Sequence, residues 1–261
     1  MKILFIGDII GKCGRKIAEA CIPALSREYL PDFIIANGEN SAHGYGITEK
    51  VYNELLDVGI DALTMGNHMW DKKEITKIMD RFPKMVRPIN YPDIVPGKPY
   101  LILEKKGVKV AITNLLGRTF MPPMDCPFQA IEKLLPVIQK ETKIILVDVH
   151  AEATSEKCAL GWFLDGKVSA VVGTHTHVMT ADERILPQGT GYITDLGMVG
   201  CLDSIIGMQK EQIIKRFITQ MHDKFEPADG GPGLFNAVFL EIDPVTGKTL
   251  TIKRIIKQTE A

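Results

Sequence analysis

The sequence predicts an α/β layered fold, and we expect one domain spanning residues 1–261. Short apolar runs alternate along the chain with longer segments whose apolar residues recur near a 3.6-residue period. Strands that alternate with helices favour mixed layers over separate all-α and all-β domains. The sequence shows no linker, internal repeat or low-complexity tract, which favours a single domain.

The expected core strands are short and apolar, and amphipathic helices separate them. The strands are KILFIG (2–7), DFIIAN (32–37), DALTMG (61–66), KIILVDV (143–149) and VSAVVG (168–173). The helices are RKIAEACIPALSREY (15–29), TEKVYNELLDVG (48–59), KKEITKIMDRF (72–82) and PFQAIEKLLPVIQKE (127–141). Thr48 is a suitable N-cap for the second helix, because its hydroxyl can accept a free backbone N–H.

Two β-rich segments interrupt this alternation. YLILEKKGVKVAITN (100–114) turns at KKG, and FNAVFLEIDPVTGKTLTIKRI (235–255) turns at DPVTG. Each reads as a hairpin, so we expect antiparallel strands at the edge of the main sheet or packed against it.

The composition excludes several classes of function. Hydrophobic residues make up 45% of the chain, charged residues 24%, and the formal net charge is −1. This balance is typical of a folded soluble protein and not of a disordered one. It provides no bulk electrostatic attraction to nucleic acid or anionic membranes, so a small-molecule partner is the better expectation. A homo-oligomer is compatible with the sequence, since symmetric oligomers are common.

The cysteines and the N-terminus indicate a reducing compartment. Five cysteines are widely spaced and include no C-x-x-C, which argues against a disulfide framework or a zinc ribbon. We therefore expect reduced thiols, with Cys13 and Cys201 in glycine-rich stretches closest to a site. MKILFIG is too short for a signal-peptide core before Asp8 interrupts it, and we expect a cytoplasmic protein without a membrane segment.

Polar residues follow the predicted core strands, and they are the strongest functional signal. They are Asp8, Glu39, Asn40, Asn67, His68, His150, His175 and His177. In an α/β sheet, the carboxyl ends of the strands form the crevice where ligands bind. Each residue alone has an ordinary structural explanation as a cap, a turn residue or a hydrogen-bonded histidine. A cluster at so many strand ends is hard to assign to packing.

The donor types favour a metal site with two ions. Carboxylate, amide and imidazole groups without a thiolate suit manganese, iron or zinc in a mixed oxygen and nitrogen site. The set is too large for one tetrahedral ion, and two ions ~3.5–4 Å apart form a clamp for displacement at phosphorus. In VVGTHTH (171–177), an extended backbone would send His175 and His177 to the same side.

These motifs resemble the calcineurin-like metallophosphoesterases. The shared features are GD after the first strand, GNH after the third, a lone histidine ending a later strand, and GTHTH. The chain departs from the usual pattern, because Ile10 stands where a histidine is expected and GEN replaces the second motif. These departures match the bacterial YmdB-like subfamily, as do GDIIGKCGR, NGENSAHGYGIT, GNHMWD, GRTFMPPMDCPF and TDLGMVG.

The resemblance covers essentially the whole chain and implies a fold and a reaction. The fold is a four-layered α/β sandwich of the metallophosphoesterase type with mixed sheets. The reaction is hydrolysis of 2′,3′-cyclic nucleotides at the 2′ ester to 3′-nucleotides, by attack of a metal-bridging hydroxide on phosphorus. Two divalent ions per chain are implied, with iron or manganese expected and zinc as the alternative.

The resemblance also assigns roles to the residues. Glu39 would bridge the ions; Asp8, Asn40 and His177 would complete one site, and Asn67, His150 and His175 the other. His68 would face the phosphate as an acid or a charge stabiliser.

Several further residues have weaker assignments. Asp71 could orient His68, although a helix cap at 72–82 is the preferred interpretation. His43 and Arg118 are candidate substrate contacts. His222 is expected to be structural.

Three alternatives stay open at this point. A P-loop is disfavoured, because three residues separate Gly7 from Gly11 and Cys13 follows Lys12. A regulatory protein could use the same fold without catalysis. A phosphatase could act instead on another phosphate ester or on an RNA end.

Overall fold

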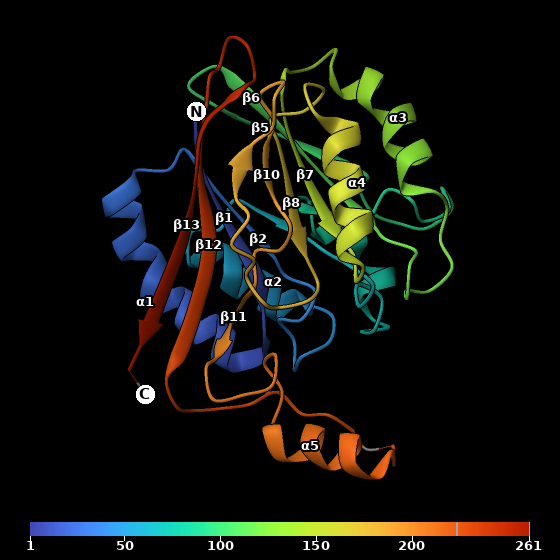
Figure 1. Ribbon diagram of the computed structural model, residues 1–261, viewed down its shortest axis with the longest axis vertical. Coiled ribbons are helices and arrows are strands. Elements are labelled where there is room, and N and C mark those ends of the chain that lie inside the picture. Colours follow the sequence, from blue (N-terminus) through green and yellow to red (C-terminus); the bar gives the residue numbers. More distant parts are fainter. Residues whose placement is uncertain (223, 261) are drawn as a thin grey trace.

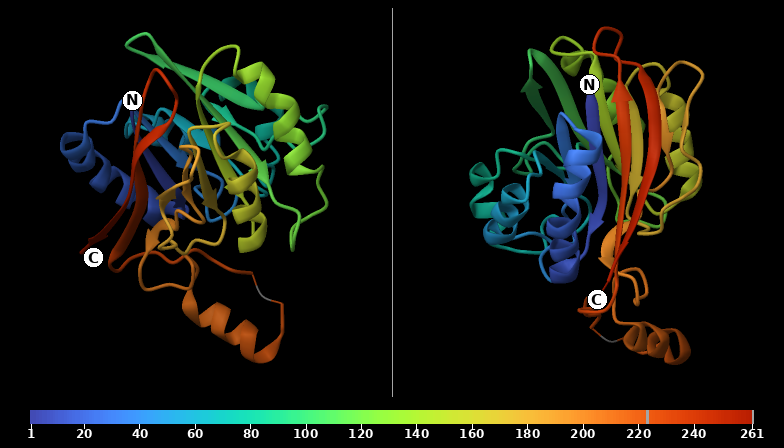
Figure 2. Two further views of the ribbon diagram at one scale, coloured as in Figure 1. Left: turned by 45° about the horizontal axis from the view of Figure 1, so that its top comes forward. Right: turned by 90° about the vertical axis from the view of Figure 1, so that its left-hand side faces the viewer.

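Two mixed β-sheets face each other, and helices cover the outer face of each sheet (Figures 1 and 2). The structure, a computed structural model, describes residues 1–222 and 224–260. The first sheet has seven strands in the spatial order β13 (Thr249–Thr259), β12 (Gly233–Ile242), β11 (Met198–Cys201), β1 (Lys2–Ile9), β2 (Phe33–Asn37), β3 (Ala62–Thr64) and β4 (Met85–Val86). The second has six in the order β5 (Tyr100–Lys105), β6 (Val108–Leu116), β7 (Ile144–His150), β8 (Ala170–Thr174), β10 (Gly191–Ile193) and β9 (Arg184–Ile185).

The helices complete four layers. Helices α1 (Gly11–Tyr29) and α2 (Glu49–Asp57) share an apolar core with the first sheet. Helices α3 (Pro127–Ile138) and α4 (Thr154–Leu164) share another with the second sheet. A third core lies between the sheets. The predicted four-layered α/β sandwich with mixed sheets is therefore confirmed.

Strand β1 shows how the sequence builds these layers. Successive side chains of a strand point to opposite faces. Ile3 and Phe5 accordingly enter the core between the sheets, whereas Leu4 and Ile6 enter the core under the helices. A strand covered on both faces must be apolar throughout, which explains the continuous run before Asp8.

Most predicted elements are present. The expected core strands are β1, β2, β3, β7 and β8, and their neighbours β1–β2–β3 and β7–β8 run parallel. Both hairpins are confirmed, since β5 pairs with β6 and β12 with β13 in antiparallel register. The Thr48 hydroxyl accepts from Val51 N at 3.3 Å, as expected of an N-cap.

The prediction of a helix over residues 72–82 is wrong. The segment forms two 3₁₀ turns, η1 (Ile75–Lys77) and η2 (Met79–Arg81). Isolated helices of this length are marginal without capping and tertiary support. No side chain caps either turn, and Ile75 is the buried residue of the pair. Local sequence periodicity was therefore an insufficient signal.

The prediction of reduced thiols is also corrected. Cys13 in α1 and Cys201 in β11 form a disulfide, whereas Cys21, Cys126 and Cys158 are free. The paired cysteines are 188 residues apart in sequence, and the parallel pairing of β1 with β11 brings them together. Spacing along the chain could not reveal this contact.

Helix α5 (Lys210–Thr219) projects away from the layers as an arm, and the sequence did not predict it (Figures 1 and 2). None of the described helices is long and apolar enough to cross a membrane.

Candidate metal centre

The carboxyl ends of strands from both sheets meet at one place. Asp8 lies near the end of β1, Glu39 and Asn40 follow β2, and Asn67 and His68 follow β3. His150 ends β7, while His175 and His177 follow β8. The structure thus brings together the side chains to which the sequence assigned metal ligation, although they span most of the chain.

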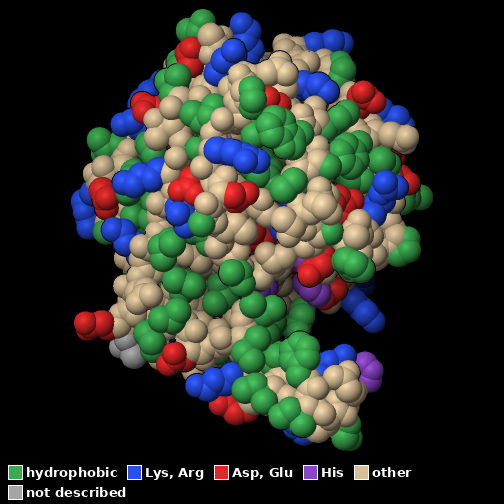
Figure 3. All heavy atoms as spheres, in the orientation of Figure 1, with side chains coloured by type: hydrophobic (Ala, Val, Ile, Leu, Met, Phe, Trp, Pro, Cys, Tyr) green, Lys and Arg blue, Asp and Glu red, His purple; other side chains and the backbone are tan. Residues whose placement is uncertain are grey.

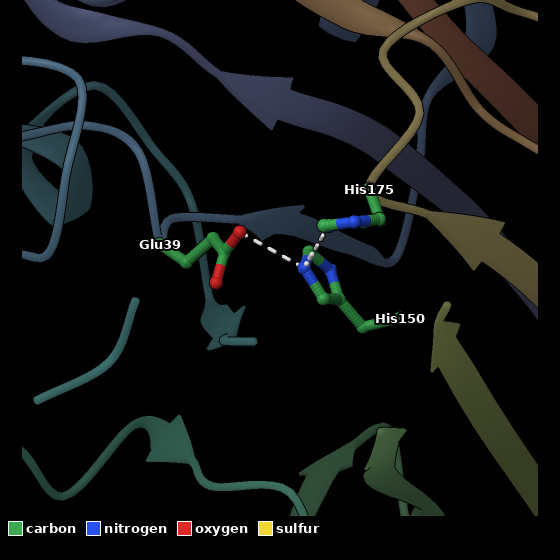
Figure 4. Close-up of side chains that lie close together, drawn as sticks. All are labelled: Glu39, His150 and His175. Carbon is green, nitrogen blue, oxygen red and sulfur yellow. Dashed lines mark hydrogen bonds and ion pairs between the residues drawn. The ribbon is translucent and has the colours of Figure 1, made fainter. Parts of the chain in front are cut away.

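Glu39, His150 and His175 form the tightest group, shown in Figure 4. One candidate ligand atom from each lies within 4.8 Å of the others. His150 Nε2 is 2.9 Å from Glu39 Oε1 and 3.0 Å from His175 Nδ1. Asn67 Oδ1 approaches the same His150 nitrogen at 3.1 Å. These donors are the ones that the resemblance assigned to one ion and its bridge.

A second group adjoins the first at Glu39. Asn40 Nδ2 lies 3.3 Å from Glu39 Oε1 and 3.2 Å from His177 Nε2. His177 Nε2 is 3.8 Å from Asp8 Oδ1. Glu39 Oε1 therefore contacts members of both groups, and its role as a bridge stays a prediction.

The outward nitrogen of His150 is fixed by a polar chain that the sequence analysis missed. Thr174 Oγ1 donates to Asp148 Oδ1 at 2.7 Å, so its remaining capacity is to accept. His150 Nδ1 lies 2.9 Å from that hydroxyl and donates to it. If the ring is neutral, this hydrogen bond leaves the Nε2 lone pair facing Glu39. A hydrogen bond donated by the second nitrogen is the usual support of a metal-binding histidine. Asp148 lies in the predicted strand KIILVDV, and Thr174 lies in GTHTH.

The other two histidines follow the same rule. His177 Nδ1 donates to the backbone carbonyl of Ile206 at 2.8 Å, and His175 Nε2 lies 3.2 Å from Glu152 Oε2. Both partners accept only, so each neutral ring directs its second nitrogen to the centre. The two residues do not lie on an extended backbone as predicted, because their φ angles are 97° and 64°. A left-handed turn after β8 aims them instead.

The pKa values follow from the balance of burial and charge. Burial raises the pKa of Asp8 to about 6, against the opposing effect of His177. Burial opposes ionisation of Glu39, but the neighbouring His150 lowers its pKa overall to about 2. For His150, burial lowers and Glu39 raises the pKa, with a net value of about 9. Burial and the adjacent His150 lower the pKa of His175 to about 3.

A cation fits this donor set. Asp8 Oδ1 is completely buried and lacks a hydrogen-bond partner among the described residues, which is costly for a carboxylate oxygen. Three imidazole rings and two buried carboxylates converge there. The donors are oxygen and nitrogen, which suits iron, manganese or zinc.

Gly66 allows the ligands to approach this closely. A β-carbon at this position would collide with Glu39 Oε2 and with the ring of His150. The glycine of the GNH motif therefore makes room for the bridge and its neighbour. Its role here depends on space and not on an unusual backbone angle.

A buried ion pair holds the turn that carries His175 and His177. Asp195 Oδ2 accepts from Lys157 Nζ at 2.6 Å and from the backbone N–H and hydroxyl of Thr176, at 3.1 and 2.7 Å. Lys157 also donates to the carbonyl of Thr174 at 2.7 Å. Asp195 belongs to the TDLGMVG stretch, which the sequence analysis identified as a family motif without assigning a role to this aspartate.

His68 stands at the edge of the centre. Its backbone N–H donates to Glu39 Oε2 at 2.9 Å, and its Nδ1 lies 2.8 Å from Asp71 Oδ2. The preferred interpretation of Asp71 as a helix cap is wrong, since no helix begins there and its carboxylate holds the histidine. Tyr45 packs edge-on against the His68 ring with centroids 4.9 Å apart.

The remaining candidates lie elsewhere. His43 is exposed and lines a neighbouring cavity with Lys12 and Arg15. Arg118 is exposed, and its backbone N–H donates to the carboxylate of Glu156. Their role as substrate contacts stays a prediction. His222 lies beyond α5, where its Nδ1 is 2.9 Å from Arg216 Nη1.

A cavity of about 430 Å³ opens over the centre. Glu39, Asn40, His68, His175 and His177 line one side of it. Its volume lies within the range typical of small-molecule sites, ~300–1,000 Å³.

The four-layered sandwich and the donors at its strand ends define a metallophosphoesterase. A model of the YmdB-like protein family matches residues 4–255. The chain is 52% identical to a Bacillus subtilis (strain 168) protein named 2′,3′-cyclic-nucleotide 2′-phosphodiesterase, over 98% of this chain and 97% of the relative. The chain therefore belongs to the YmdB-like family, as the sequence motifs predicted.

Solved structures agree with this assignment. A hypothetical protein from Thermus thermophilus superposes with a TM-score of 0.92 and 41% identity, over 99% of this chain and 100% of the other. A Mycoplasma pneumoniae protein described as a novel phosphatase superposes with a TM-score of 0.93 and 36% identity, over 100% of this chain and 94% of the other. The predicted class of enzyme, a phosphoric diester hydrolase, is confirmed by these relationships. Metallophosphoesterases of this kind imply the use of divalent metal ions.

Proposed function

We propose that the protein binds two divalent metal ions and hydrolyses 2′,3′-cyclic nucleotides at the 2′ ester, releasing 3′-nucleotides. The arrangement of the histidines is the observation that carries the proposal. His150, His175 and His177 each direct one nitrogen to an acceptor outside the centre. The other nitrogen faces Glu39 in His150, Asp8 in His177 and the Nε2 of His150 in His175. Such supported rings are prepared to bind metal.

The ligand assignment follows the two groups described above. Asn67, His150 and His175 would hold one ion, and Asp8, Asn40 and His177 the other, with Glu39 shared. The bound ions would lower the pKa of a water and neutralise charge that develops on the phosphoryl oxygens. Iron or manganese, with zinc as the alternative, and a cytoplasmic location are part of the proposal.

His68 is the proposed catalytic side chain. It lines the cavity without being needed as a ligand, and Asp71 holds its Nδ1. The Nε2 of the ring can therefore face a phosphate in the cavity. As an imidazolium it would stabilise negative charge and donate a proton to the departing 2′ oxygen. Asp71 would orient the ring through its contact with Nδ1.

The name of the Bacillus relative supports the choice of substrate, since 52% identity extends over nearly all of both chains. A cyclic diester is also compatible with a cavity of about 430 Å³. Other phosphate esters and RNA ends share the same reacting group, so product analysis must separate them.

The test combines metal content with product identity. Purified protein is loaded with Mn²⁺ or Fe²⁺, its metal content is measured by elemental analysis, and adenosine 2′,3′-cyclic phosphate is supplied. The expected result is about two metals per chain and 3′-AMP as product. His150→Ala should lose metal, whereas His222→Ala, a histidine outside the centre, should retain it. A product of 2′-AMP, or two metals without turnover of this substrate, would contradict the substrate assignment. Metal content equal in both variants would contradict the ligand assignment.

A further inference from the structure

The cavity over the metal centre has a second, apolar side. Besides the histidines and Glu39, the cavity is lined by Ile206, Met208, Ile213, Phe217 and Phe225, which lie on α5 and the segments flanking it. Among the described residues that line this side, Arg216 is the one with a charged side chain. We call this surface the arm wall. Figure 3 shows hydrophobic side chains gathered on the arm and a hollow between the arm and the body.

Hydrogen bonds close the base of the arm and connect it to the metal centre. Gln209 N donates to the carbonyl of Glu226 at 2.9 Å, and Ala228 N donates to that of Gly207 at 2.9 Å. These bonds join the two ends of the arm. The carbonyl of Ile206 also accepts from His177 Nδ1 at 2.8 Å, which connects the arm to a proposed metal ligand.

Folding explains only part of the composition of the arm wall, because Met208 and Ile213 are buried whereas Phe217 is not. Ile213, Arg216 and Phe217 share one face of α5 because they are three and four residues apart. Phe217 is 75% exposed, so its ring adds little to the core. The guanidinium of Arg216 lies over the Phe225 ring, 5.5 Å from its centroid. Planar apolar groups are thus available beside a strongly polar reaction centre.

We propose that the arm wall binds the nucleobase of the substrate, with Phe217 and Phe225 providing stacking surfaces. This inference rests on the proposed function, which places a nucleotide phosphate at the metal centre. A nucleotide has a charged phosphate at one end and a flat base at the other. The cavity likewise combines a polar metal centre with an apolar wall. An aromatic ring can stack on any base, because every base has a π face.

The arm wall also predicts weak selection among bases. Arg216 is its charged donor, and Arg216 Nη1 already lies 2.9 Å from His222 Nδ1. Discrimination between bases requires hydrogen bonds to their edges, which apolar side chains cannot make. We therefore expect the four 2′,3′-cyclic nucleotides to have kcat/KM values within about tenfold of one another.

The experiment compares two substrates with the same cyclic phosphate. One is adenosine 2′,3′-cyclic phosphate, and the other is methyl riboside 2′,3′-cyclic phosphate, in which a methoxy group replaces the base. With the metal-loaded enzyme we expect a preference for the nucleotide of at least about tenfold in kcat/KM. Phe217→Ala should remove most of this preference, mainly by raising KM for the nucleotide about tenfold.

Ile218→Ala is the matched control. Ile218 follows Phe217 in the same helix and is 77% exposed, but it is not among the residues that line the cavity. This variant should keep the preference of the unaltered protein. Circular dichroism and metal content establish that both variants are folded and loaded.

The outcomes separate this inference from the proposed function. If both substrates are hydrolysed equally well, or if Phe217→Ala keeps the full preference, the base subsite is refuted while the reaction stands. If neither substrate is hydrolysed, the proposed function fails, and calorimetry of the metal-loaded protein with 3′-AMP and with ribose 3-phosphate decides the subsite. Tighter binding of 3′-AMP that Phe217→Ala abolishes would support it. Equal binding would refute it.

Discussion

Replacing Lys157 by methionine should destabilise the protein and loosen the metal centre together. Lys157 is 1% exposed and Asp195 is completely buried, and their charged atoms are 2.6 Å apart. Methionine has a similar volume but leaves the carboxylate without its cation. Removing one partner of a buried ion pair costs ~3–5 kcal/mol, because the remaining charge stays desolvated. For a chain of this size that loss corresponds to a decrease in Tm of roughly 6–20 °C.

The assay is thermal and urea unfolding of the metal-free protein, followed by titration with Mn²⁺. Lys133→Met, which removes an exposed lysine of α3, serves as the control and should change stability by less than about 0.5 kcal/mol. Adding Asp195→Asn to Lys157→Met should recover part of the loss, since both charges are then removed. The reasoning would be refuted if Lys157→Met unfolded within about 1 kcal/mol of the unaltered protein and bound Mn²⁺ equally well.

Three further changes test the site and its surroundings. Gly66→Ala should reduce metal content well below that of the unaltered protein, because the new methyl group would occupy space taken by His150; elemental analysis showing full loading would contradict this. His68→Ala should retain the metals but lose about 10²–10⁴-fold in kcat, and undiminished turnover would remove the catalytic assignment. Hydrogen bonds from Thr180 and Thr194 overcome burial and lower the pKa of Asp182, so its stabilising effect is present above the unfolded pKa of ~3.9 and is lost as pH falls. Asp182→Asn should therefore lower Tm at pH 7, with the difference closing below about pH 4; a difference independent of pH would contradict the argument.

The sequence predicted the position of the centre because two simple rules apply to it. Apolar runs identify strands, and ligands gather at the carboxyl ends of parallel strands. Asp8, Glu39 and His150 all follow this pattern. The assignment of particular donors to particular ions came from the family resemblance. Strand prediction alone does not provide it.

Other features depend on contacts between distant segments. The support of His150 by Thr174 and Asp148 joins adjacent strands, and the disulfide joins residues 188 apart. Helix α5 has an apolar face like any surface helix, and its sequence does not reveal that the face lies over a cavity instead of a core. The left-handed turn at His175 and His177 was missed because non-glycine residues rarely adopt positive φ.

The location of the proposed centre makes the two sheets of the sandwich interdependent. Glu39 belongs to one sheet, whereas His150 and His175 belong to the other, so ions held by all three would cross-link the layers. A chain with only one sheet formed would present half of the ligands and bind weakly. Metal would therefore favour the fully docked sandwich by mass action, adding ~2.7 kcal/mol when the free ion is about 100-fold above its dissociation constant. With such a centre, metal supply would affect the lifetime of the folded protein as well as its turnover.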